Sequence, residues 1–192
     1  MIHKKSLPFM NNSLSYKYNI LCEVKMAKIK LQGNPINTAG EMPAIGSSAP
    51  VFLLTAADLK DVSMQDFQGK KLLLNIYPSI DTGVCAMSVR KFNAEAANLD
   101  NTVVLGISRD LPFALGRFCG AEGIDKVYTL SEMHNRNFGK DYGLEIVDGP
   151  MAGLLARSVI IIDEKGKIKY TELVDDIVHE PNYEAALAAL ID

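Results

Sequence analysis

Cys85 is the residue whose surroundings most favour chemistry, because it lies within PSIDTGVCAMSVRKF (78–92) at the boundary of two patterns. Upstream, LLLNIY (72–77) is a short apolar run typical of a buried strand. Downstream, a helix is expected over about 88–99, because four apolar residues recur at helical spacing: Val89, Phe92, Ala96 and Leu99. At such a junction, unpaired backbone N–H groups and the helix dipole favour an anion such as a thiolate. A small buried hydrophobe is an equally good interpretation of the position alone.

Thr82 and Pro78, which precede this cysteine, each allow a chemical and a structural interpretation. A threonine three residues before a helix-start cysteine can place its hydroxyl beside the sulfur, where it donates to a thiolate and accepts from a protonated substrate oxygen. Thr82 also suits a helix N-cap, and one position can serve both purposes. Pro78 could stiffen the loop or shield the sulfur from water.

Cys119 follows in RFCGAEG, near the end of the next expected helix. Alone, it is most simply a half-buried helical thiol, whereas beside a reactive Cys85 it could resolve an oxidised intermediate. Neither cysteine belongs to a Cys-X-X-Cys pair, which argues against thioredoxin-type dithiol exchange.

Arg157 stands immediately before the apolar run SVIIID. An arginine at the start of a strand is usually solvated or salt-bridged. In the folded chain it could instead lie beside the edge of strand 72–77 and direct its guanidinium at Cys85. Such a cation would lower the pKa of the thiol and hold peroxide oxygens. Spacing along the sequence does not decide between these interpretations.

The overall composition excludes several other classes of protein. A chain of 192 residues with 48% hydrophobic and 22% charged residues suits one globular domain. Its net charge of −3 gives no electrostatic reason to expect nucleic acid or an anionic membrane as a partner. Three cysteines are too few for a disulfide-stapled secreted scaffold, so a reducing cytoplasm is the expected compartment. The three scattered histidines offer neither zinc-ligand spacing nor a base near Cys85 for a Cys–His hydrolase, and no metal or cofactor is expected.

Residues 1–26 differ in character from the rest of the chain. Polar residues interrupt any hydrophobic stretch there, which does not favour an export signal. We interpret this segment as an unstructured tail or a start assigned too early, with Met26 as the true beginning and no role for Cys22. The domain is then expected over 27–192.

The expected order of elements is that of an α/β protein. AKIKLQ and INTA flank Gly33-Asn34-Pro35, which predicts an N-terminal hairpin. VSMQDFQGKK is expected to form a short helix ended by Gly69, and Pro181 suits the first turn of a closing helix. A Gly/Pro/Ser-rich crossing, GEMPAIGSSAP, leads to VFLLTA. Further strands are expected at 72–77, 103–108, VYTL, 158–162 and 167–174, and further helices at 112–122 and about 132–141. Strands and helices that alternate and then give way to a hairpin and a helix predict an α/β sandwich with a central mixed sheet flanked by helices.

Three long stretches carry a resemblance to a known family: PSIDTGVCAMSVRKFN, NTVVLGISRDLPFALGRFCGAEG and DGPMAGLLARSVIIIDE followed by LVDDIVHEPNYEAALAAL. From about Ala27 to Asp192 the chain resembles the bacterial thiol peroxidases, which are atypical two-cysteine peroxiredoxins of thioredoxin-like fold. The resemblance implies Cys85 as peroxidatic cysteine and Cys119 as resolving cysteine. It also implies Thr82 and Arg157 as activating partners and Pro78 as a shield, in a homodimer recycled by thioredoxin.

The function expected from this resemblance is the reduction of hydroperoxides, organic or hydrogen peroxide, through a Cys85 sulfenate and an intrasubunit Cys85–Cys119 disulfide. A disulfide needs the two Cα atoms within about 7 Å, so local unwinding around one or both cysteines is expected. The alternative is a redox sensor on the same fold that is oxidised once and does not turn over.

Overall fold

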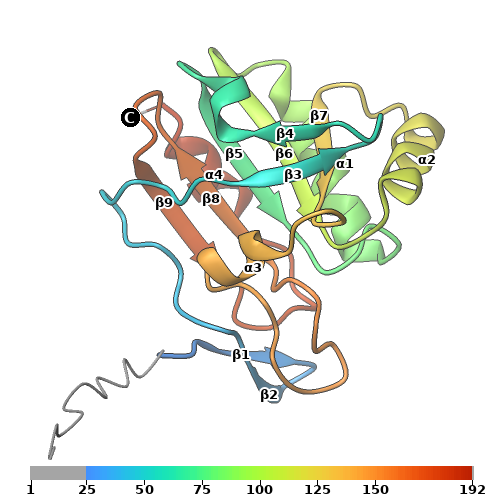
Figure 1. Ribbon diagram of the computed structural model, residues 1–192, viewed down its shortest axis with the longest axis vertical. Helices are drawn as coiled ribbons and strands as arrows, with labels where there is room; N and C mark the ends of the chain where they lie inside the picture. Colours follow the sequence, from blue (N-terminus) through green and yellow to red (C-terminus); the bar gives the residue numbers. More distant parts are fainter. Residues whose placement is uncertain (1–24, 192) are drawn as a thin grey trace, which may run out of the picture.

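A seven-stranded mixed sheet forms the centre of the computed structural model, which describes residues 25–191 (Figure 1). The strands lie in the order β4-β3-β7-β6-β5-β8-β9. Their bounds are Leu53–Ala56 (β3), Asp61–Ser63 (β4), Lys71–Ile76 (β5), Thr102–Ser108 (β6), Val127–Ser131 (β7), Ser158–Ile162 (β8) and Ile168–Leu173 (β9). The expected fold class is confirmed.

The strand β5 lies in the interior of this sheet. It pairs in parallel with β6 and antiparallel with β8, and from Leu72 to Ile76 every side chain is buried. A strand that is covered on both faces reads as a continuous apolar run, which is why this segment could be recognised in the sequence. β5 ends at Ile76, and the loop that follows it leads to the helix that carries Cys85.

Helices cover the two faces of the sheet unequally. The core on one face joins Cys85, Val89 and Phe92 to side chains of two other helices. The helices on this face are Gly83–Ala96 (α1), Pro112–Glu122 (α2) and Tyr183–Ala188 (α4). The opposite face is covered by the short helix α3 (Asn137–Asp141) and the 3₁₀ turn η1 (Met64–Phe67). Both cysteines of the described chain therefore lie in the three-helix layer.

Several expected boundaries are wrong. α1 begins at Gly83, five residues before the first expected helical residue, so that Cys85 lies inside its first turn. α3 is half the expected length, because Glu132 is buried and accepts hydrogen bonds from Arg109 and from the backbone of Gly139. Pro181 precedes the N-cap of α4, Asn182, and is not in the first turn.

The segment expected as a short helix before Gly69 also differs from the prediction. Its first two residues belong to β4, and η1 supplies a single 3₁₀ turn in place of an α-helix. Ser63 donates to the Asp66 carboxylate through its backbone and its hydroxyl, which caps the start of this turn.

An N-terminal hairpin forms a separate two-stranded sheet, as expected, and lies apart from the main sheet at the lower edge of Figure 1. Its turn is Gln32-Gly33 and not the expected Gly33-Asn34-Pro35, because Asn34 and Pro35 already pair with Leu31 and Lys30. Its strands are Lys28–Leu31 (β1) and Asn34–Asn37 (β2). The carboxylate of Asp176 accepts hydrogen bonds from both residues of the hairpin turn, Gln32 at 3.0 Å and Gly33 at 2.7 Å. The hairpin is thus held against the segment that follows β9. Over residues 25–191, none of the helices has the length and apolar character that crossing a bilayer requires.

Candidate functional site

The Cys85 thiol is fully buried in the first turn of α1. The loop between β5 and α1 is fixed by Asp110. This residue lies just after the end of β6, the strand that neighbours β5. Its carboxylate accepts hydrogen bonds from the Ser79 hydroxyl and the Ile80 backbone, each at 2.7 Å, and from the Ser108 hydroxyl at 2.8 Å. Parallel pairing of β5 with β6 thus places the anchor of the loop beside the loop itself.

Thr82 occupies the N-cap position of α1, but its side chain makes no capping hydrogen bond. Its hydroxyl lies 2.8 Å from the Cys85 sulfur and 3.1 Å from the carbonyl oxygen of Ser79. A hydroxyl carries one hydrogen and two lone pairs, so it donates to one of these two atoms at a time. A thiolate at Cys85 would draw that hydrogen to sulfur, whereas a thiol could donate to the threonine oxygen.

Arg157 is buried, with 2% of its surface exposed, and one guanidinium nitrogen (Nη2) lies 3.4 Å from the Cys85 sulfur. The antiparallel pairing of β5 with β8 places Ile76 opposite Ser158, which brings the arginine to the end of β5. Its Nε donates to the carbonyl oxygen of Ile177 at 2.9 Å, which orients the guanidinium. Nη1 has no hydrogen-bond partner within residues 25–191, so the buried guanidinium keeps a donor available.

Cys119 lies apart from this cluster. Its thiol is half-buried on α2, and its sulfur is 3.6 Å from the hydroxyl of Thr129 on β7. Burial raises the pKa of this thiol, and the Thr129 contact opposes the shift only in part. In the described chain Cys85 and Cys119 are both free thiols, without a disulfide between them. The structure therefore brings Thr82 and Arg157 to Cys85 but leaves the second thiol in a separate environment.

Pro78 is buried in the loop that leads to α1. Three further residues around the site were not singled out from the sequence. Besides Asp110, Ser88 donates to the backbone carbonyl of Cys85 at 2.8 Å, and Tyr77 is fully buried just after β5. A polar residue after an apolar strand was the available signal for Asp110; Tyr77 and Ser88 look like ordinary core positions in the sequence.

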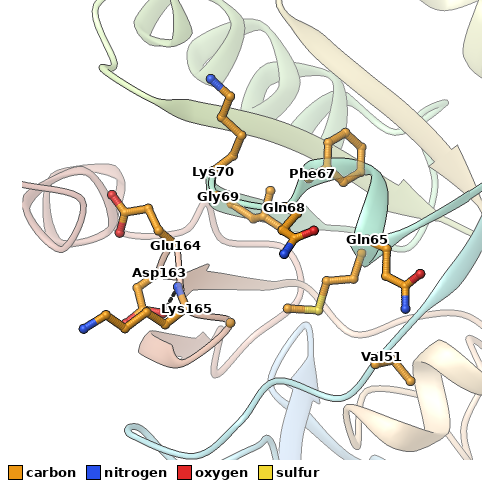
Figure 2. A pocket seen from close by; sticks show the side chains of 12 residues that line it. Val51, Gln65, Phe67, Gln68, Gly69, Lys70, Asp163, Glu164 and Lys165 are labelled. Atoms are coloured by element: carbon orange, nitrogen blue, oxygen red, sulfur yellow. Dashed lines mark hydrogen bonds between the residues drawn. The ribbon is translucent and has the colours of Figure 1, made fainter.

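Two hollows of the surface have walls that do not include Cys85. Figure 2 shows one of about 480 Å³ between η1 and the turn that joins β8 to β9, where Gln65, Lys70 and Glu164 are among the lining residues. None of the candidate site residues is among those that line it. A second hollow, of about 630 Å³, has Cys119 in its wall together with Tyr128 and Thr129. The second thiol thus faces an open, mainly apolar depression, whereas the first is enclosed.

The chain is similar to known proteins over most of its length. Residues 44–187 match the Redoxin family. The chain is 58% identical over 165 residues to the thiol peroxidase of Corynebacterium glutamicum, a match that spans 86% of this chain and 99% of that protein. It is equally similar, over the same shares, to the thiol peroxidase of Mycobacterium tuberculosis.

Solved structures give the same result for the fold. A peroxiredoxin-like protein from Aquifex aeolicus superposes with a TM-score of 0.82 and 35% identity, over 86% of this chain and 97% of that one. The thiol peroxidase from Chromobacterium violaceum superposes with a TM-score of 0.79 at 20% identity, over 85% of this chain and 95% of that one.

Proposed function

This chain belongs to the thiol peroxidase family and is a thiol-dependent peroxidase, and on that premise we propose that Cys85 attacks the hydroperoxide and Cys119 resolves the product. The observation that carries the assignment is the convergence of Thr82 and Arg157 on the Cys85 sulfur, at 2.8 and 3.4 Å. Two donors on one sulfur stabilise the thiolate, which is the nucleophilic form of cysteine.

In the first step, the Cys85 thiolate attacks the terminal oxygen of the hydroperoxide. A sulfur–oxygen bond forms, the O–O bond breaks, and the other oxygen leaves as an alcohol or water after it takes up a proton. Negative charge moves from sulfur to the departing oxygen. The free Nη1 of Arg157 suits that charge, because a preorganised donor in a buried site stabilises it without reorganisation. Pro78 keeps bulk water from the sulfur in this proposal.

In the second step, the Cys119 thiolate attacks the Cys85 sulfenic acid. The S–O bond breaks as the S–S bond forms, and hydroxide leaves with the proton that Cys119 gave up, so that the net by-product is water. Cys119 belongs to α2 and contacts β7, so it must leave Thr129 to reach α1. We therefore expect local unwinding of one helix or both when the disulfide forms.

The remaining parts of the proposal concern the partners. Thioredoxin reduces the disulfide and restores both thiols by thiol exchange. The enzyme acts in the cytoplasm as a homodimer, and the apolar side chains of Met87, Leu111 and Phe113, which are exposed on α1 and at the start of α2, are candidate contacts between subunits. Sedimentation analysis of the wild type and of Phe113→Lys tests this part separately.

One oxidation experiment tests the central assignment. One equivalent of hydroperoxide should consume both thiols and give a Cys85–Cys119 peptide cross-link, and the product should run as a monomer on a non-reducing denaturing gel. Cys119→Ser should react once and then stop as sulfenate, whereas Cys85→Ser should not react. Repeated turnover with thioredoxin and its reductase distinguishes the enzyme from a sensor. A covalent dimer, or normal turnover by Cys119→Ser, contradicts the assignment.

A further inference from the structure

Tyr77 is fully buried, and its hydroxyl has no hydrogen-bond partner among residues 25–191. A buried polar group without a partner destabilises the fold, and phenylalanine at the same place would avoid the cost. Tyr77 therefore calls for an explanation other than packing.

The position of the hydroxyl is defined by Gly106 on β6. A Cβ atom built at Gly106 would lie 3.1 Å from the hydroxyl oxygen, so the absence of a side chain leaves room for the phenol. In the parallel pairing of β6 with β7, Gly106 lies opposite Thr129. Thr129 is the residue whose hydroxyl contacts the Cys119 sulfur. The phenol hydroxyl is thus next to the strand position that holds the second thiol.

The same ring belongs to the core that contains Cys85, and Cys119 packs against that core. Burial raises the pKa of Tyr77 well above its ordinary value, and the nearby Asp110, Cys119 and Cys85 act in the same direction. The phenol therefore keeps its proton while the thiols react, and it can act only as a hydrogen-bond donor to a thiolate. Asp110, Cys119 and Cys85 are the titratable groups of the described chain that affect the pKa of this phenol.

We propose that the Tyr77 hydroxyl is a donor held for the resolution step, in which it hydrogen-bonds to the Cys119 sulfur as that sulfur leaves Thr129 and approaches the Cys85 sulfenic acid. The resolving thiol must become a thiolate to attack, and its present surroundings disfavour the charged form. A hydrogen-bond donor beside the path of the Cys119 sulfur replaces the contact with the Thr129 hydroxyl and favours attack by the thiolate. The phenol gains no net proton and loses none, so the balance of the step stays as given above.

This inference rests on the proposed role of Cys119, and the test separates the two. Tyr77→Phe removes only the hydroxyl. We expect the oxidation of Cys85 to keep the wild-type rate and disulfide formation to slow by roughly 10- to 100-fold, the effect of one hydrogen bond to a charged group. Because the sulfenate then persists, excess hydroperoxide should convert more of it to sulfinic acid. Quench-flow alkylation followed by peptide mass spectrometry measures the sulfenic acid, the disulfide and the sulfinic acid together.

Tyr142→Phe is the matched control, because Tyr142 is also fully buried but donates to the carbonyl oxygen of Pro50 on the opposite face of the sheet. This variant should lose thermal stability and keep the wild-type rate of disulfide formation. Tyr77→Phe should show the reverse pattern, with unchanged or higher stability. If Tyr77→Phe forms the disulfide at the wild-type rate, the donor role is wrong even though the function stands. If the wild type itself forms no Cys85–Cys119 disulfide, the proposed function fails, and this inference fails with it.

Discussion

Replacing Arg157 with methionine should slow the oxidation of Cys85 by about 100- to 1,000-fold while the fold is retained. Methionine keeps much of the apolar stem but removes the charge. At the observed Nη2–sulfur distance of 3.4 Å, opposite unit charges attract by about 5 kcal/mol at an effective dielectric constant of about 20. That figure is a ceiling, because the arginine is desolvated and Thr82 still donates to the sulfur in the variant. A loss of about 3–4 kcal/mol corresponds to the stated range of rates.

The assay must follow the first step alone. The chain contains no tryptophan, so quench-flow trapping of the sulfenic acid followed by mass spectrometry replaces a fluorescence signal. A Cys119→Ser background stops the reaction at that intermediate. Arg157→Lys should give a smaller loss of rate, because an ammonium group keeps the positive charge. Some loss remains, since an ammonium group lacks the planar set of donors that binds the Ile177 carbonyl and the sulfur together.

Arg117→Met is the control for a loss of positive charge near the site. Arg117 is exposed and pairs with Asp81, in the loop before α1, at 3.2 Å. Its removal should leave the rate unchanged, because exposed ion pairs contribute little. Thermal melting checks that Arg157→Met is folded, since the variant leaves the Ile177 carbonyl without its donor. Oxidation of folded Arg157→Met at the wild-type rate would refute the electrostatic reasoning and reduce Arg157 to a structural residue.

Three further outcomes are expected. Thr82→Val should slow the same step by roughly 10- to 100-fold, and Thr82→Ser, which keeps the hydroxyl, should lose much less; equal losses would contradict donation to sulfur. Because burial raises the pKa of Cys119, its thiolate fraction should grow with pH. Disulfide formation, followed by quench-flow alkylation and mass spectrometry, should therefore accelerate by about tenfold per pH unit from neutrality upward, and a flat profile would refute this. Asp176→Asn should lower the melting temperature by loosening the hairpin turn, whereas exposed Asp175→Asn should not; equal melting temperatures would show that the turn contributes nothing.

The sequence was most informative where local residues set the boundaries. The bounds of α2 were predicted correctly because Pro112 fits the first helical position and Gly123, with φ of +65°, ends the helix in the left-handed region. The start of α1 was missed because its first turn, Gly83 to Cys85, carries no apolar periodicity. The loop that leads into that turn is held by Asp110, which belongs to a different part of the chain and accepts hydrogen bonds from Ser79 and Ile80.

Contacts between distant residues could not be derived from spacing. The separation of 72 positions between Cys85 and Arg157 is consistent with many geometries, and only the register of β5 with β8 makes the two residues neighbours. The resemblance named Arg157 without explaining how it reaches the sulfur. Tyr77 was not identified at all, because a tyrosine that ends an apolar strand is an ordinary core residue until its missing hydrogen bond is seen. The proposed extent of the domain, 27–192, stays a prediction, which the stability and activity of a chain that begins at Met26 would test.

The separation of Cys85 from Arg157 along the chain has a consequence for biosynthesis. At about 5–20 residues per second, the ribosome adds the arginine roughly 4–14 s after the cysteine. During that interval the thiol has neither its cation nor the strand that brings the cation, so it reacts with peroxide as an ordinary cysteine does. Cys85 and Cys119 are both made before β8, and the proposed reactive site is assembled only when β8 pairs with β5. On the proposed roles of Cys85 and Arg157, a growing chain in an oxidising cell does not react faster with peroxide at this thiol until β8 has been made.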